Sequence, residues 1–346
     1  MRNTPEATAT PDPLVESLVC PWRDGKRWVY SITFDEALIE LHQFVVPVLE
    51  KHGVPGHLEA VAGHIGIVRQ IGNSSYNGFR HMSGSEMRDM ISRGWGVGNH
   101  SYSHGQVNAE TAETELGQSK RVLEEAIGEP ITIYCAPGDN QNMNEGALAA
   151  CRKYGYLGAM SITDALNRPN DPDLLWMNRT FLHEQGYGPF YSAFDPFRNI
   201  ALAQRDHGWI IDYCHCPMEK CVHPNKDCSA AQLQERIETI VSEGADQVWL
   251  ARVEEAVDYR YTRRHTKIEK RTPSPGTPGD VRGGGQVEEY ALSAPGLPDS
   301  VRWRTLTLRS PKNAKAVEVD KKPTRLTNGL FDVEVSPQPK IVRIIQ

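Results

Sequence analysis

Short β-branched and aromatic runs alternate with helix-forming segments through most of the chain, and this alternation limits the fold more than any other feature. Buried strands are predicted at residues 28–34, 95–97, 131–134, 157–162, 208–213 and 247–250. Helices are predicted between them, at 44–52, 85–93, 109–127, 145–154 and 231–242. Strands that alternate with helices in this way favour parallel βα units over a β-sandwich.

The pattern changes after Tyr261. Residues 272–285, TPSPGTPGDVRGGG, are dense in Pro and Gly and predict a linker or a long surface loop. Beyond them the runs VRWRTLTLR, AVEVD, GLFDVEV and KIVRII alternate with a period of two, which predicts a small all-β unit. We therefore expect an N-terminal arm at 1–27, an α/β domain at 28–261, a linker or loop at 262–285 and a β-rich domain at 286–346.

Composition excludes several classes of protein. The 346 residues are 39% hydrophobic with a net charge of -6, and no apolar run approaches the length of about 18 residues that a membrane span needs. Basic residues are in modest excess after Tyr261 but are scattered, so nucleic acid binding is not expected. Seven cysteines and a start without an apolar signal segment predict reduced thiols and a cytoplasmic protein. Homo-oligomerisation stays open.

Three predicted strand ends carry polar residues that suit catalysis. Asp35 and Glu36 follow the first strand, His100 and His104 follow the second, and His215 follows a late one. In βα folds, reactive groups gather where strands end. Two histidines four residues apart can reach one metal ion, and two histidines with one carboxylate leave coordination positions open for water. The second carboxylate is then available as a general base.

Each of these features also has a simpler interpretation. An Asp-Glu pair commonly caps a helix, an HxxxH pair commonly decorates a surface, and His215 between two cysteines suits a protein core. Their joint occurrence, each after a β run, favours a single site. The stretch CHCPMEKCVHPNKDC at 214–228 suggests a structural zinc site or a redox bridge, but its spacing departs from paired C-x2-C, and a loop of ordinary thiols is favoured.

The same motifs resemble the NodB-homology domain of the polysaccharide deacetylases, carbohydrate esterase family four. Thr33-Phe34-Asp35-Glu36 is similar to the family's TFDD motif, and the stretch Gly98–His104 is similar to its H-S/T-x-x-H motif. Tyr134–Gly138 stands where the family has an FRPPY-like motif, and Ile210–His215 resembles its late strand that ends in histidine. The resemblance spans about 28–259 and implies a distorted (β/α) barrel, to which the sequence adds a small all-β C-terminal unit.

The resemblance also implies a role for each residue. Asp35 would be the general base and His215 the general acid. Glu36, His100 and His104 would hold a divalent metal ion, with zinc expected, and the backbone N–H near Gly138 would stabilise the oxyanion. Tyr134 and Trp176 are the candidate substrate-binding aromatics.

Three positions depart from the family pattern. Glu36 stands where the family has Asp, and Gly138 replaces a tyrosine. Cys135 replaces the arginine that tethers the base, and cysteine cannot supply that cation. We expect Arg168 or Arg179, from a later loop, to take its place.

The sequence thus predicts a metal-dependent deacetylase that removes an N-acetyl or O-acetyl group from a carbohydrate. One alternative is a hydrolase of a small non-sugar amide or cyclic imide. The other is a carbohydrate-binding protein without catalysis, which the missing arginine and the added β unit suggest.

Overall fold

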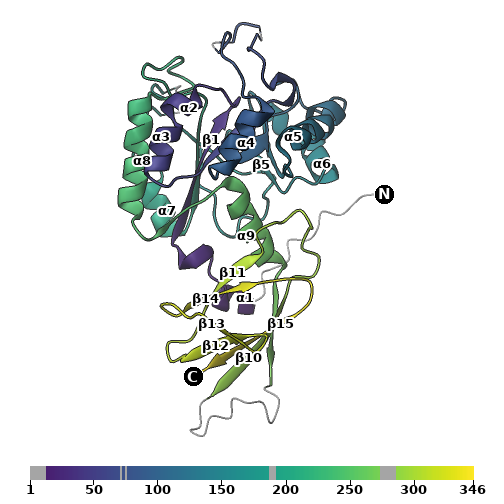
Figure 1. Ribbon diagram of the computed structural model, residues 1–346, viewed down its shortest axis with the longest axis vertical. Coiled ribbons are helices and arrows are strands. Elements are labelled where there is room, and N and C mark those ends of the chain that lie inside the picture. The colour runs from purple at the N-terminus through teal and green to yellow at the C-terminus, as the bar shows by residue number, and fades with distance from the viewer. Residues whose placement is uncertain (1–12, 71, 75, 187–191, 273–285) are drawn as a thin grey trace. The chain divides into compact units, whose positions relative to one another are not determined.

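The structure, a computed structural model, describes residues 13–70, 72–74, 76–186, 192–272 and 286–346. The chain forms two compact units (Figure 1). The larger one comprises Trp28–Val257. The smaller one combines Met1–Arg27 with Asp258–Gln346. The sequence placed the corresponding boundaries at 27 and 261.

The larger unit is built on a curved parallel sheet with β1 at its centre. Its strands run in the order β5-β4-β3-β2-β1-β7-β6, and β8 pairs with β1 outside this path. Their bounds are β1 Trp28–Asp35, β2 Gly56–Ala60, β3 Gly96–Asn99, β4 Ile133–Cys135, β5 Gly158–Met160, β6 Thr180–Phe181, β7 Trp209–Cys214 and β8 Val248–Leu250. Every residue of β1 is buried, as expected for a strand with neighbours on both edges and covered faces. The predicted distorted (β/α) barrel is confirmed.

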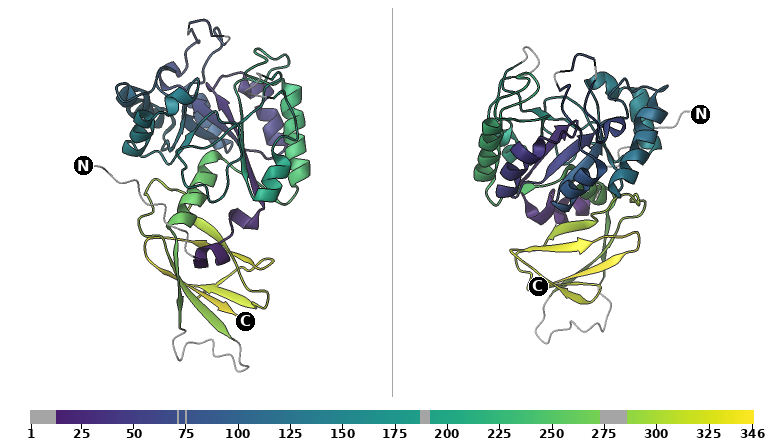
Figure 2. Two further views of the ribbon diagram at one scale, coloured as in Figure 1. Left: turned by 180° about the vertical axis from the view of Figure 1, so that it is seen from behind. Right: turned by 45° about the horizontal axis from the view of Figure 1, so that its top comes forward.

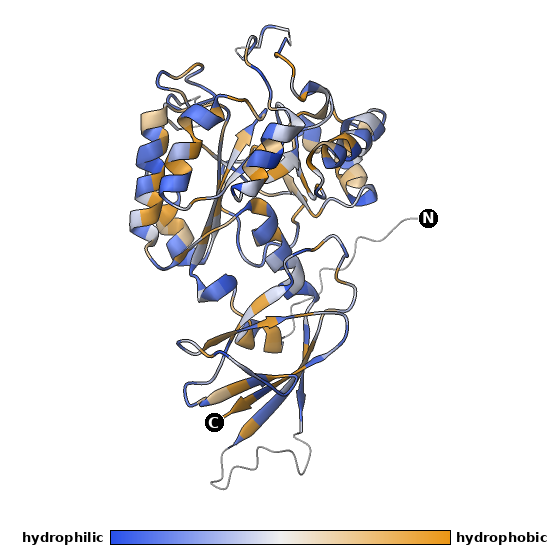
Figure 3. Cartoon of the chain, in the orientation of Figure 1, coloured by the Kyte–Doolittle hydropathy of each residue, from blue (hydrophilic) through white to orange (hydrophobic). Residues whose placement is uncertain are grey.

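Helices lie on the outer side of this sheet (Figure 2). They are α2 Leu41–Phe44, α3 Val46–Lys51, α4 Gly84–Ser92, α5 Ser119–Ile127, α6 Glu145–Lys153, α7 Ile200–Asp206, α8 Ala230–Gly244 and α9 Val253–His265, which continues into the smaller unit. Helix α8 begins at a capping box between Ser229 and Gln232 and buries Leu233, Ile237 and Ile240 along one face, so that hydrophobic and hydrophilic patches alternate on it (Figure 3). Among the described residues, no helix has the length and apolar character that crossing a membrane requires.

Two predicted helices differ from the observed ones for local reasons. Of the segment 44–52, residues 46–51 form α3, with Pro47 in its first turn, where the missing N–H costs no hydrogen bond, and Phe44 is the last residue of α2. The segment 109–127 is α-helical only from Ser119, and a π-helical stretch, Glu113–Gln118, precedes α5. In that stretch Glu115 accepts hydrogen bonds from the backbone N–H groups of Tyr102 and Ser103 (both 3.0 Å).

The smaller unit is a set of antiparallel strands. One sheet has the order β13-β12-β15-β10-β9, and β11 pairs with β14. The bounds are β9 Lys267–Arg271, β10 Val287–Ser293, β11 Thr305–Arg309, β12 Ala316–Val319, β13 Lys322–Thr324, β14 Leu330–Glu334 and β15 Lys340–Ile345. The all-β C-terminal unit is confirmed.

Part of the predicted linker at 262–285 has regular structure. Residues 262–265 complete α9, and β9 follows directly, because Ile268 is buried opposite Leu292 of β10. Residues 273–285 lie outside the described part of the chain.

The N-terminal arm predicted at 1–27 also differs from the observed structure. Its described part contains α1, Pro13–Leu18, and a 3-10 turn at Arg23–Gly25. Val15, Val19 and Trp22 are buried, and Val19 pairs with Leu308 of β11. These apolar side chains make the segment part of the β-rich unit. Residues 1–12 are outside the described range.

An imidazole held between two carboxylates lies inside the larger unit. His57 of β2 is 2.5 Å from Glu59 and 3.0 Å from Glu254, measured from its Nδ1 and Nε2 atoms, and all three side chains are buried. Burial acts to lower the pKa of His57, but Glu254 and Glu59 outweigh it and raise the pKa to about 10. The imidazolium therefore joins β2 to the start of α9 through charge.

This triad predicts a loss of stability in alkali. The folded state keeps the His57 proton up to about pH 10, whereas an unfolded histidine loses it near 6.5. The protonated His57 therefore adds roughly 3–5 kcal/mol to the free energy of unfolding below about pH 6.5. This contribution is lost as pH rises through the folded pKa.

Urea unfolding from pH 6 to 10.5 measures this slope. His57→Gln should flatten it and lower stability at pH 7, whereas His52→Gln, at a half-buried position beside Glu238, should keep it. An unchanged slope in His57→Gln would contradict the assignment.

Candidate active site

The proposed site lies where β1 ends. Asp35 is the last residue of β1, and Glu36 follows in a left-handed conformation with φ 77°. Ser101 and His104, in the loop after β3, also have positive φ values of 70° and 59°. Non-glycine residues in this region carry a conformational cost, so several in one place indicate a geometry that the surroundings impose.

Glu36, His100 and His104 come together as the sequence predicted. Their ligand atoms all lie within 4.8 Å of one another, and Nε2 of His104 is 3.2 Å from Oε1 of Glu36. The loop that carries the two histidines is an irregular turn, closed by a hydrogen bond from the His104 N–H to the Ser101 hydroxyl (3.0 Å). The two rings nevertheless lie 5.0 Å apart.

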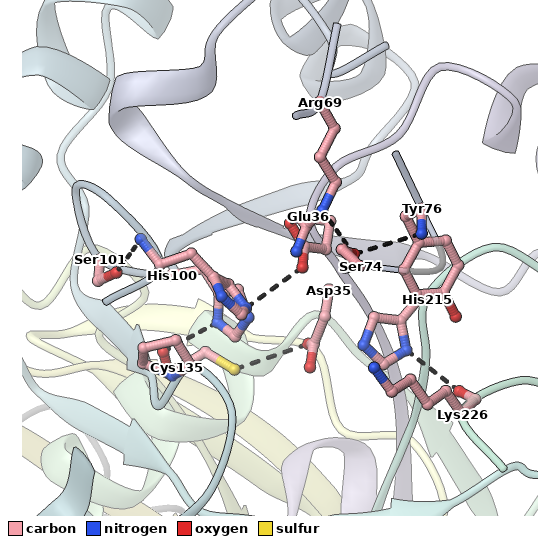
Figure 4. Close-up of polar contacts among 12 residues, drawn as sticks. Asp35, Glu36, Arg69, Ser74, Tyr76, His100, Ser101, Cys135, His215 and Lys226 are labelled. Carbon is pink, nitrogen blue, oxygen red and sulfur yellow. Dashed lines mark hydrogen bonds and ion pairs between the residues drawn. The ribbon is translucent and has the colours of Figure 1, made fainter. Parts of the chain in front are cut away.

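The ring orientation of His100 suits a metal ligand. Its Nδ1–H donates to the backbone carbonyl of Cys135 (3.0 Å), which leaves the lone pair of Nε2 available (Figure 4). Burial lowers the pKa of both His100 and His104, with neighbouring cations adding to the effect. Neutral imidazole is the form that binds metal. The three residues therefore fit a divalent cation.

Glu36 has a second partner that the sequence did not indicate. The guanidinium of Arg69 contacts the Oε2 atom of Glu36, and both side chains are buried. Glu36 thus presents one oxygen to the histidines and the other to a fixed cation, as Figure 4 shows.

Two other groups of potential ligands share these residues. Asp35, His100 and Cys135 form one, and Glu36, His64 and His81 form the other. In the first, burial raises the pKa of the Cys135 thiol, which therefore stays protonated and is a poor ligand. In the second, the Glu36 oxygen that Arg69 does not contact lies 3.2 Å from His104, which is not a member of that group. The group formed by Glu36, His100 and His104 is the best candidate metal centre.

Arg179 takes the place of the arginine missing at position 135. It lies immediately before β6, is fully buried, and its Nη1 donates to Oδ1 of Asp35 (2.7 Å). Its Nε donates to the Ser161 carbonyl, and its guanidinium stacks on the Tyr213 ring at 4.0 Å. Arg168, the other residue considered, instead lies 3.8 Å from Asp206.

This ion pair sets the charge of Asp35. Burial acts to raise the pKa of the carboxyl, but Arg179, followed by His100 and His215, holds it well below its usual range. Asp35 is therefore ionised throughout the physiological pH range. Cys135, 3.6 Å from the same oxygen, adds a weak thiol hydrogen bond instead of a charge.

His215 faces Asp35 from the end of β7. Its ring stacks on Tyr76 at 5.0 Å, and its Nδ1–H donates to the Lys226 carbonyl (3.1 Å). Asp227 accepts the backbone N–H of His215 (2.6 Å) and the hydroxyl of Tyr76 (2.5 Å), which fixes both rings. Burial lowers the pKa of His215 to about 4.

These side chains line one pocket of about 190 Å³. Its lining consists of Asp35, Glu36, Arg69, Tyr76, His100, His104, Ala136, Gly138, Ile162, Phe181, His183, Tyr213, His215, Asn225 and Lys226. Gly138 is thus present at the pocket. A larger hollow of about 460 Å³ lies in the β-rich unit around Asp24 and Asp332, and its lining contains no residue of the candidate ligand groups found among the described residues.

Neither aromatic residue predicted to bind substrate is part of the pocket lining. Tyr134 is fully buried and donates its hydroxyl to the Asn142 carbonyl (2.9 Å). Since side chains alternate along β4, Cys135 faces Asp35 and Tyr134 faces the opposite side. Trp176 is 39% exposed, whereas the next residue, Met177, is buried and bridges Met160.

Arg69, Tyr76, His183 and Lys226 line the pocket but were not predicted as site residues. Arg69 and Tyr76 lie in the segment between β2 and α4, and Lys226 lies in the loop between β7 and α8. These loops have no local periodicity that would assign a direction to a side chain. These residues lie together only because the loops that carry them fold back to the edge of the sheet.

Residues 23–159 match the sequence model of the family described as polysaccharide deacetylase. The resemblance inferred from the motifs is confirmed. A curated protein of Bacillus subtilis (strain 168), YxkH, named as a candidate polysaccharide deacetylase, is 28% identical over 128 residues. That match covers 36% of this chain and 41% of the relative, so the chain spans less than half of that relative's length.

Solved polysaccharide deacetylase structures are among the similar folds. A candidate polysaccharide deacetylase from Mycobacterium smegmatis aligns with a TM-score of 0.47 and 18% identity, over 78% of this chain and 98% of the other. The PuuE allantoinase aligns with a TM-score of 0.46 and 14% identity, over 69% and 92%.

The Arg179–Asp35 pair predicts a pH-dependent loss of stability in a variant. Arg179→Gln leaves Asp35 buried without its cation, which should cost roughly 3–5 kcal/mol at pH 7. The pKa of Asp35 then rises because burial is no longer opposed. Protonation should relieve the penalty as pH falls from 7 towards 4.

Denaturant unfolding at several pH values measures the effect. Arg168→Gln is the matched control and should stay within about 0.5 kcal/mol of the parent at every pH. Equal stability losses at pH 7 and pH 4 in Arg179→Gln would show that Arg179 does not compensate the charge of Asp35.

Proposed function

We propose that the protein is a metal-dependent deacetylase that hydrolyses an N-acetyl or O-acetyl group of a carbohydrate. The observation that carries this proposal is that the two carboxylates at the end of β1 have different partners. Glu36 converges with His100 and His104, while Asp35 forms an ion pair with Arg179. One carboxylate is thus available to bind a cation and the other to handle a proton. The match to the polysaccharide deacetylase family supports this chemistry.

Glu36, His100 and His104 would hold the ion, and zinc is the expected metal for a site of two imidazoles and a carboxylate. When bound, such an ion polarises an acyl carbonyl and lowers the pKa of water. Asp35 accepts a proton from the attacking water. The ion pair with Arg179 fixes the orientation of its carboxylate before the substrate arrives.

Gly138 and His215 act on the other side of the reacting carbon. The backbone N–H beside Gly138, which lines the pocket, donates to the acyl oxygen as negative charge develops on it. His215 delivers a proton to the departing nitrogen or oxygen. Because the pKa of His215 is about 4, its ring is neutral at rest. It relays the proton that Asp35 has taken from water, and acetate and a free amine or hydroxyl are released.

The alternative of a binding protein without catalysis loses its main argument. That interpretation rested on the missing cation at Cys135, and Arg179 supplies a guanidinium to the same carboxylate. The alternative of a small amide or cyclic imide has one observation in its favour. A pocket of about 190 Å³ is smaller than the usual range of ligand pockets. An assay of acetate release from acetylated sugars, run beside ring opening and hydrolysis of small amides, separates the two substrates.

Metal analysis and turnover of two variants test the assignment together. His104→Ala should reduce the bound metal from one ion per chain to nearly none, and should reduce kcat/KM at least 100-fold because a ligand is lost. Asp35→Asn should keep the metal and lower kcat by a similar factor. The control His52→Ala should retain both.

An Asp35→Asn protein with full kcat would remove Asp35 from the proton transfer. Full metal content in His104→Ala would remove His104 from the ligand set. Parent protein that binds metal but releases no acetate from any acetylated sugar would refute the substrate class.

A further inference from the structure

We propose that this site selects substrates that carry a carboxylate close to the acyl group, and that Lys226 and Arg69 bind this carboxylate. The inference rests on the proposed deacetylase function and adds a substrate class to it.

Two cations face the same pocket from different loops. Arg69 comes from the segment between β2 and α4, and its side chain is only 4% exposed. Lys226 comes from the loop between β7 and α8. Figure 4 shows the Lys226 side chain extending past His215 towards the centre of the site, while Arg69 enters from the opposite direction. Burial, followed by the charge of Arg69, lowers the pKa of Lys226.

Lys226 has no anionic partner among the described residues of the chain. Its ammonium makes no ion pair there, although the neighbouring Asp227 is fully buried. The Asp227 carboxylate is instead turned towards the Tyr76 hydroxyl and the backbone N–H groups of His215 and Cys216. The loop thus directs the Lys226 ammonium into the site, while the Asp227 carboxylate stabilises the loop itself.

The charges of the site as a whole are not balanced. Asp35 and Glu36 are matched by Arg179 and Arg69, each in direct contact. Lys226 is then an excess positive charge, and a divalent ion would add two more. A neutral acetylated sugar leaves this excess uncompensated, whereas a carboxylate between Lys226 and Arg69 neutralises it.

Three probes separate this inference from simple sugar binding. N-acetylglucosamine is neutral. N-acetylglucosaminuronic acid carries a carboxylate at C6, and N-acetylmuramic acid carries one on the O3 side chain. Binding is measured by calorimetry at pH 7 in the His215→Gln background, which slows turnover and leaves the charge of the site unchanged. At least one acid should bind 10-fold or more tightly than the neutral sugar, and added NaCl should reduce the ratio.

Three lysine variants identify the responsible group. Lys226→Gln should bring the ratio of acid to neutral affinity close to one, and Lys226→Arg should keep most of it. Lys220→Gln, at an exposed position of the same loop, should leave the ratio unchanged. A ratio of one or less in the parent, absence of acid binding, or an unchanged ratio in Lys226→Gln would each overturn the inference.

Acetate release from the unsubstituted enzyme distinguishes this failure from failure of the proposed function. Equal kcat/KM for the neutral and acidic sugars would leave the deacetylase and refute the carboxylate preference. Lys226-dependent binding of an acid without acetate release from any probe would retain the carboxylate site and count against the deacetylase.

Discussion

The site depends on the ion pair between Arg179 and Asp35. Two adjacent carboxylates at the end of a buried strand repel each other and lose hydration, so each needs a cation to stay ionised. Arg179 supplies the cation for Asp35, and the stacking of its guanidinium on Tyr213 fixes its position. Glu36 is then free to turn towards His100 and His104. The structure thereby gives two neighbouring carboxylates of similar intrinsic acidity different partners and different proposed roles.

Other buried charges in the larger unit are also neutralised by partners of opposite sign. His57 lies as an imidazolium between Glu59 and Glu254 in the interior, and Arg69 contacts Glu36 at the pocket. A buried charge is tolerated because a partner of opposite sign lies in direct contact with it. Lys226 at the pocket is exposed and makes no ion pair among the described residues, so its ammonium is available to a substrate anion.

Sequence patterns predicted that the candidate site residues lie together because they follow the ends of parallel strands. In a parallel sheet the carboxyl ends of strands share one edge, so Asp35, Glu36, His100, His104 and His215 had to lie near one another once the βα order was recognised. The details of the connections were less predictable. The loop with His100 and His104 is irregular, and the helix predicted at 109–127 contains a π-helical stretch. Tyr134 and Trp176 are not part of the pocket lining: alternation along β4 directs Tyr134 away from it, and Trp176 lies in a bend.

The sequence by itself determined the alternation of strands and helices, the all-β character of the C-terminal unit and the residues at the strand ends, because these follow from local periodicity. It did not predict β2, β6, α7 or α9. It narrowed the replacement for the missing arginine to two residues. Only the tertiary structure decided for Arg179 over Arg168 and brought Arg69, Tyr76 and Lys226 into the pocket. The reason is physical: these residues lie in long connections, where the return path of the backbone, and not any repeat in the sequence, sets the direction of a side chain.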